Sequence, residues 1–120
     1  MTILDRLQAL TGPDREVDAL IYIRIGAKPP AEGAFYWTSP SGTIEHYAAS
    51  IPHFTGSIDA AMTLVPEGYD FILSGIEGDY SAEVGPESSV VAHTAQDIIG
   101  GPAIALCIAA IKAEEAQHEQ

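Results

Sequence analysis

The chain has 120 residues, and its seventeen acidic residues outnumber five basic ones, for a formal net charge of −12. This charge argues against nucleic-acid binding, which requires Lys and Arg to neutralise phosphates. One cysteine excludes an intramolecular disulfide, and the longest apolar run, residues 103–111, is far shorter than the about 20 residues of a membrane span. We predict one domain over residues 1–120, with a frayed tail at 113–120.

The charges are distributed unevenly. Ten acidic residues and neither Lys nor Arg occur between Pro29 and Ile111. The simpler interpretation is a soluble acidic protein, since net charge mainly governs solubility and association. The alternative is an acidic surface that binds a basic partner. The first ten residues lack the pattern of a secretory signal, so we expect a cytoplasmic protein.

Two helices are expected in the first 26 residues. Thr2 and Asp5 have the spacing of a capping box, and apolar residues follow with helical period up to residue 10. Gly12 ends this helix, and Pro13 suits the first turn of a second helix that closes at Gly26.

Residues 34–48 predict a β-hairpin, because AFYWTS and TIEHYA flank the turn sequence PSG. Aromatic residues gather around it. Core packing is their ordinary role, and the alternative is an aromatic binding platform. A ligand with phosphate groups would also need cations folded back toward this hairpin. The candidate ligand-binding residues are Tyr36, Trp37, Tyr47, Arg24 and Lys28.

Residues 54–69, FTGSIDAAMTLVPEGY, predict a helix of about nine residues. Ser57 is the expected N-cap, Asp59 lies near the positive end of the helix dipole, and Pro66 ends the helix. A helix this short is unstable alone, so we interpret it as a brace that packs its apolar face on the rest of the fold.

A second hairpin follows, with YDFILSG and YSAEVG around IEGD. Polar residues alternate with apolar ones in its second strand, so one face of that strand is expected to face water. The stretch SSVVAHT predicts a further strand. Residues 100–102, GGP, open a last helix that is apolar nearly all round from Ala103 to Ile111, which implies burial on more than one side.

This order of elements predicts an α+β fold: a three-layer α/β/α sandwich with a mostly antiparallel sheet of four to five strands. The last helix must be covered either by the first two helices or by a second chain. We expect a homodimer, because apolar burial over a standard interface outweighs screened repulsion. Its interface would use a stripe of small residues, Ala105, Ala109, Ala113 and Ala116.

Three blocks, LDRLQALTGPDREVDALI, FTGSIDAAMTLVPEGY and GGPAIALCIAAI, resemble in order and spacing the phage ABA sandwich domain family of small phage and prophage proteins. The middle block is the most specific. The resemblance implies an α/β/α layered fold and a phage or prophage origin, hence the cytoplasm of a bacterial host. It carries no catalytic residues. The family usually has a hydroxyl residue before the proline of the last block, where this chain has Gly101.

No pattern in the sequence points to catalysis. There is no glycine-rich phosphate loop with Lys, the four histidines lack metal-ligand spacing, and Cys107 lies among apolar residues. We therefore predict no enzymatic activity, no cofactor and no metal. The leading hypothesis is a phage-encoded accessory protein that acts by binding, as an inhibitor of a host protein in counter-defence. The alternatives are a protein that sequesters a nucleotide signal and an acidic mimic of nucleic acid.

Overall fold

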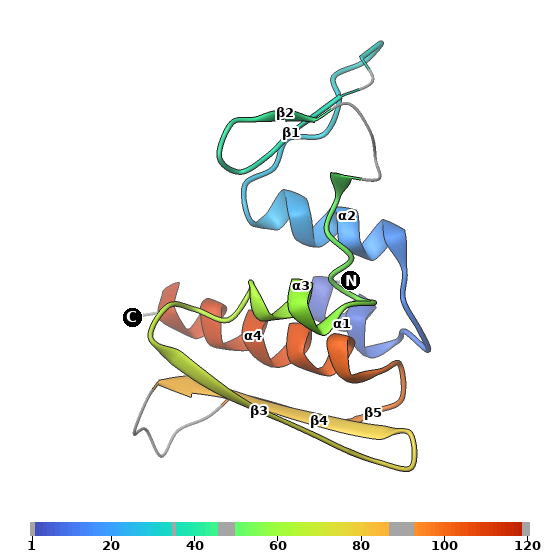
Figure 1. The fold of residues 1–120 in the computed structure, drawn as a ribbon, viewed down its shortest axis with the longest axis vertical. Helices are drawn as coiled ribbons and strands as arrows, with labels where there is room; N and C mark the ends of the chain where they lie inside the picture. Colours follow the sequence, from blue (N-terminus) through green and yellow to red (C-terminus); the bar gives the residue numbers. More distant parts are fainter. Residues whose placement is uncertain (1, 35, 46–49, 87–92, 119–120) are drawn as a thin grey trace.

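The computed structural model describes residues 2–34, 36–45, 50–86 and 93–118 (Figure 1). It has the predicted α+β composition, with antiparallel strands. The helices are α1 (Ile3–Gln8), α2 (Arg15–Arg24), α3 (Ile58–Met62) and α4 (Pro102–His118). The strands are β1 (Trp37–Thr38), β2 (Ile44–Glu45), β3 (Tyr69–Ile76), β4 (Asp79–Pro86) and β5 (His93–Ile98).

Side-chain caps begin the first two helices. The predicted capping box of α1 is confirmed: the Asp5 amide donates to Thr2 Oγ1 (3.1 Å), and the Thr2 amide donates to Asp5 Oδ2 (3.0 Å). The prediction for Pro13 is wrong. It precedes α2, whose N-cap is Asp14, because the Asp14 carboxylate accepts from the amides at the start of the helix.

Helix α3 is a five-residue brace against α4. Ser57 is its N-cap, as predicted, and accepts from the Ala60 amide at 3.2 Å. The helix is shorter than expected, since residues 63–65 form turns ahead of Pro66. Ala61 is fully buried, and α3 packs on α4. This agrees with the interpretation of this segment as a brace.

Both predicted hairpins form. In the first, Trp37 pairs with Glu45, and β1 also bridges to Lys28, whose amide donates to the Thr38 carbonyl at 2.8 Å. In the second, β3 and β4 pair over their whole length around Glu77 and Gly78, which have the positive φ angles, 49° and 82°, of a two-residue hairpin turn.

Strand β5 joins the second hairpin through a bulge. Tyr80 pairs with Ile98, but Ala82 pairs with Ala95, so β5 has one residue more than β4 between these pairs. The strand predicted over residues 88–94 lies mostly outside the described residues, and β5 continues beyond it to Ile98. The result is a three-stranded sheet, β3-β4-β5, separate from the two-stranded one. The described strands therefore do not form the single four- to five-stranded sheet that was predicted.

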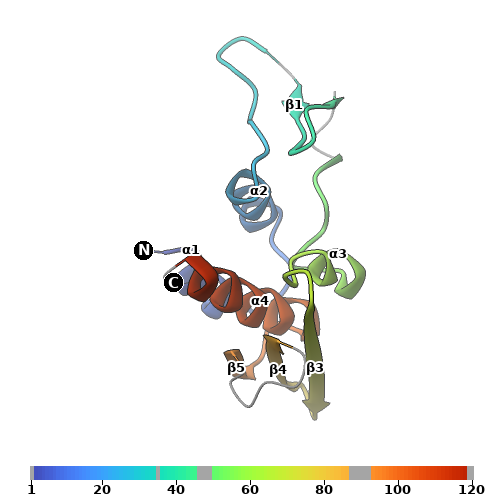
Figure 2. The same cartoon turned by 90° about the vertical axis from the view of Figure 1, so that its left-hand side faces the viewer.

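Helix α4 forms the centre of the molecule. The sheet packs on one side of it, and α1 and α3 pack on the other (Figure 2). Its residues from Ala103 to Ile111 are buried, as predicted for a helix covered on more than one side. Ala105, Ala109 and Ala113 are 0% exposed, so the chain itself covers most of the small-residue stripe proposed as a dimer interface, and only Ala116 is half-buried. The helix continues to His118, through most of the segment for which fraying was predicted.

One face of the three-stranded sheet has no layer on it among the described residues. Figures 1 and 2 show α4 above the sheet and no described element below it. In β4 the inward Ala82 and Val84 are buried, and Glu83 between them is exposed. The prediction that one face of this strand meets water is therefore confirmed. The third layer of the predicted sandwich stays a prediction.

Candidate functional site

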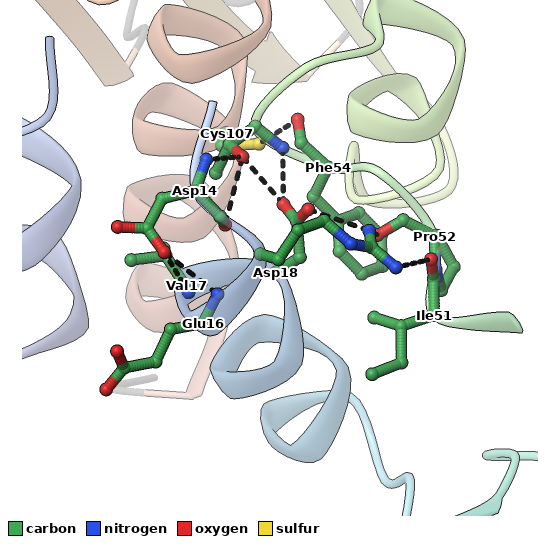
Figure 3. Close-up of polar contacts among 10 residues, drawn as sticks. Asp14, Glu16, Val17, Asp18, Ile51, Pro52, Phe54 and Cys107 are labelled. Carbon is green, nitrogen blue, oxygen red and sulfur yellow. Dashed lines mark hydrogen bonds and ion pairs between the residues drawn. The ribbon is translucent and has the colours of Figure 1, made fainter. Parts of the chain in front are cut away.

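A buried polar network joins the start of α2 to residues 51–55 (Figure 3). Asp18 is 1% exposed, and its Oδ1 accepts from the amide and the hydroxyl of Thr55, both at 2.8 Å. Its Oδ2 accepts from the Arg15 guanidinium at 2.9 Å. Arg15 also donates to the Ile51 carbonyl at 3.0 Å. Both carboxylate oxygens are thus satisfied, as a buried charge requires.

Cys107 of α4 borders this network, and its thiol donates to the Phe54 carbonyl at 3.2 Å (Figure 3). Burial, and secondarily the negative charge of Asp18, raise the pKa of Cys107 to about 12. The thiol therefore stays protonated at neutral pH, whereas a nucleophilic cysteine needs a lowered pKa. We assign this network a structural role: it fastens α2 and residues 51–55 to α4.

The predicted ligand residues of the first hairpin do not all come together. Trp37 is partly buried against the core, with its ring centroid 6.0 Å from that of Tyr22. Tyr36 is 45% exposed. Tyr47 lies outside the described residues. Tyr22 also donates to Glu45 Oε1 at 2.7 Å, and Glu45 Oε2 is buried with no partner in the part of the chain that the structure describes.

The two basic residues that were predicted to bind a ligand, Arg24 and Lys28, lie in different parts of the structure. The backbone of Lys28 bridges to Thr38 of β1, so this residue lies at the first hairpin. Arg24 instead contacts α4, donating to Glu114 Oε2 at 2.6 Å and to Glu115 Oε1 at 3.3 Å. It borders a groove of about 340 Å³ between α2, the end of α3 and α4. The lining residues are Ile21, Arg24, Ile25, Thr63, Leu64, Ile111 and Glu114.

The open face of the three-stranded sheet is the strongest candidate for an interaction surface. We define it by the residues that alternate with the core-facing ones. They are Asp70, Ile72, Ser74 and Ile76 on β3, Asp79, Ser81 and Glu83 on β4, and Thr94 and Gln96 on β5. Ile72 is 61% exposed and Ile76 is 77% exposed. They are two of nine large hydrophobic side chains that are exposed in the described residues, and their position on one sheet face makes them available to a partner.

Acidic residues surround these isoleucines. Residues 69–86 and 93–98 contain Asp70, Glu77, Asp79, Glu83 and Asp97, and neither Lys nor Arg. Among the described residues, ion pairs use Glu16, Asp18, Glu114 and Glu115, and none uses an acid of the sheet. The acids of the sheet therefore have no ion-pair partner in the described part of the chain, although Lys112 of α4 reaches the Thr94 carbonyl at the β5 edge.

The open face is shallow. A depression of about 140 Å³ lies at its centre between Ile72, Glu83 and Thr94. A larger concave region of about 620 Å³ lies at the turn end of the hairpin and includes Ile76, Asp79 and Asp97. Small-molecule sites are usually deep and mostly apolar. The shape of this face instead suits a macromolecular partner.

Sequence reasoning did not identify the open face as a site, although the alternation in β4 contained its signal. Within the described residues, no group of three or more His, Cys, Asp or Glu is placed to hold a metal ion, and no helix is long and apolar enough to cross a membrane. A scan against protein-family models and searches of curated proteins and solved structures found no significant match.

Proposed function

We propose that this protein acts by binding a basic partner protein through the open face of its three-stranded sheet, without catalysis. One observation carries the proposal: exposed isoleucines, and carboxylates with no ion-pair partner among the described residues, share a sheet face that no described element covers. Full burial of an exposed isoleucine contributes about 1.5–3 kcal/mol, and covering Ile72 or Ile76, which are already partly buried, contributes part of that amount. The carboxylates add attraction and selectivity for a surface rich in Lys and Arg.

The resemblance to the phage ABA sandwich domain family supports a more specific role. A small phage or prophage protein with such a surface would be an accessory protein that inhibits a host protein in the bacterial cytoplasm, in counter-defence. The resemblance also implies a three-layer sandwich. Its missing layer would lie on the open face, and we propose that the bound partner covers that face.

An acidic mimic of nucleic acid has weaker support. Asp79 and Glu83 are four residues apart on β4, which corresponds to about 13 Å along a strand. Duplex DNA carries one charge per about 1.7 Å of its axis. The charge density of the open face is therefore much lower than that of a duplex, and its isoleucines have no counterpart in a phosphate backbone.

Sequestering of a nucleotide signal is the second alternative, and the groove beside Arg24 is the observation that favours it. Its volume of about 340 Å³ is within the range of small-ligand pockets. The two carboxylates on Arg24, however, would repel a phosphate. Thermal-shift measurements with cyclic nucleotides test this alternative, and an Arg24→Gln variant would lose any shift that depends on the groove.

Self-association is a separate prediction. The sequence favoured a homodimer because α4 needed a cover, and within one chain α1, α3 and the sheet provide that cover. An interface through the small-residue stripe would require α4 to leave the core. A homodimer would therefore use another surface, and light scattering at physiological salt measures whether it forms.

The proposed function is tested with a library of short capped peptides in which Lys or Arg alternates with apolar residues. We expect the wild-type protein to bind members of this library, with affinity that falls steeply as salt rises. Glu83→Gln removes a charge from the centre of the open face, and Glu32→Gln removes one from an exposed loop. Weaker binding only in the first variant supports the proposal, whereas equal effects in both would contradict it.

A further inference from the structure

We propose that the basic partner binds by strand addition, as an extended segment along the free edge of β3. This inference rests on the proposed function and specifies the edge of the sheet at which the partner is held beside the open face. In this binding mode, main-chain hydrogen bonds supply affinity, and alternate side chains supply specificity.

The edge of β3 is available for pairing. In the order β3-β4-β5, β3 is an outer strand, and β4 is its one partner among the described residues. Alternate residues of an antiparallel strand direct their N–H and C=O groups away from the partner strand, so an outer strand presents a row of unpaired groups. The eight pairs between β3 and β4 contain no bulge. The free edge of β3 is therefore regular along its whole length.

Proteins usually protect such an edge with Lys, Pro, a bulge or a covering element. The sequence of β3, YDFILSGI, contains neither Lys nor Pro. In Figure 2 no described element lies beyond β3. Within the described residues, the edge thus lacks Lys, Pro, a bulge and a covering element, and its one charged side chain, Asp70, repels an acidic strand but not a basic one.

The opposite edge of the same sheet, at β5, is protected against pairing with another strand, unlike the edge at β3. Strand β5 carries the bulge, and Asp97 within it has a φ of 58°. Lys112 of α4 donates to the carbonyl of Thr94 at 2.9 Å. A bulge twists an edge away from pairing, and a lysine there opposes an approaching strand. We therefore expect an added strand to pair with β3 and not with β5.

The side chains of β3 define the pattern of the added segment. On one side of the sheet, partner residues would lie beside the partly buried Phe71 and Leu73 of the core-facing row. On the other side they would lie beside Asp70 and Ile72 of the open face. Side chains of a strand alternate between these two sides. The fitting segment therefore alternates apolar residues, toward the core side, with Lys or Arg, toward the open face.

Charge favours this segment over a second copy of the chain. Two copies paired along β3 would bring the carboxylates of both sheets onto one continuous face, and each chain has a net charge of −12. A segment rich in Lys and Arg would instead neutralise Asp70 and Glu83. Pairing of two copies through β3 is thus an outcome of the test that would overturn the inference.

The decisive probe is a short capped peptide of alternating lysine and valine, together with two N-methylated forms. In an extended strand all valine amides point to one edge and all lysine amides to the other. Only one set can donate to β3. We expect methylation of one set to weaken binding about tenfold or more, a loss of at least 1.4 kcal/mol, and methylation of the other set to have little effect.

Two measurements on the protein complete the test. With the unmethylated peptide, hydrogen exchange at alternate amides of β3 should slow about tenfold or more, without change in β1 and β2. Ile72→Lys should weaken binding more than Ile44→Lys, which adds the same charge at an isoleucine that is 57% exposed in β2.

Failure of strand addition can be distinguished from failure of the proposed function. Salt-dependent binding to the open face with equal affinity for both methylated peptides would overturn strand addition and leave the proposed function standing. Failure of the unmethylated peptide to bind, while other basic peptides of the library bind the open face, would overturn strand addition by this segment, and failure of every peptide would contradict both. A mass that doubles with concentration, with protection of β3 in the absence of peptide, would identify a second copy as the occupant of the edge.

Discussion

The hydroxyl of Thr55 donates to Oδ1 of Asp18 over 2.8 Å, and both residues are almost completely buried. The same hydroxyl oxygen accepts from the Asp14 amide at 2.8 Å. One side chain thus satisfies both the N-cap residue of α2 and a buried carboxylate of the same helix. This links the position of α2 to residues 51–55 and, through Phe54, to Cys107 of α4.

Replacing Thr55 tests this link. Thr55→Val keeps the shape of the side chain but leaves the Asp14 amide and the Asp18 carboxylate each without one partner, which should lower the free energy of unfolding by about 1–3 kcal/mol. Thr55→Ser keeps the hydroxyl and should cost less. Urea denaturation measures both variants, and a Thr55→Val protein as stable as the wild type would contradict the role assigned to the network.

Alkaline pH should destabilise the fold through Tyr22. Burial, then the hydrogen bond to Glu45 and its charge, raise the pKa of Tyr22 from 10 to about 12. The contribution of neutral Tyr22 to the free energy of unfolding is therefore fully present below pH 10 and is lost as pH rises from 10 toward 12. Cys107 titrates in an overlapping range, so Tyr22→Phe should remove only part of the alkaline decline. An identical decline in wild type and Tyr22→Phe would contradict this assignment.

Gly100 is held in a site with no room for a side chain. A Cβ there would lie 2.7 Å from the Leu10 carbonyl oxygen and from Ile104 Cδ1. Gly100→Ala should therefore destabilise the fold by about 1–3 kcal/mol. Gly12→Ala is the matched control, because a Cβ at Gly12 meets nothing within 4 Å. Thermal unfolding of both variants checks the prediction, which equal effects would refute.

Ala109→Glu distinguishes burial within the chain from burial between two chains. Ala109 is 0% exposed in the single chain, so a carboxylate there should destabilise the fold by more than about 4 kcal/mol. Gln117→Glu adds the same charge at an exposed position of the same helix. A folded, monomeric Ala109→Glu protein derived from a dimeric wild type would show instead that α4 forms an interface between chains.

Local signals predicted most of the elements. The capping box of Thr2 and Asp5, the N-cap of Ser57 and the IEGD turn each depend on residues a few positions apart, and each forms as expected. The period of two in β4 also indicated a face toward water. These features are decided by backbone geometry and short-range hydrogen bonds, which a sequence displays directly.

The candidate site was less predictable because it depends on contacts that are distant in sequence. Arg24 was expected near the hairpin, but it pairs with Glu114, 90 positions away. The free edge of β3 follows from the position of β5 on the other side of β4, and the bulge that protects β5 has no clear signature in its sequence. Which side of a sheet remains uncovered is decided by the packing of α4, not by any one strand.

The most direct test of the central claim is amide chemical-shift mapping of the labelled protein with the alternating lysine and valine peptide. Perturbations should concentrate on β3 and on the open face around Ile72 and Glu83, and they should weaken with salt and in Glu83→Gln. Perturbations confined to the first hairpin around Trp37, or to the groove beside Arg24, would contradict the account, as would the absence of any shift.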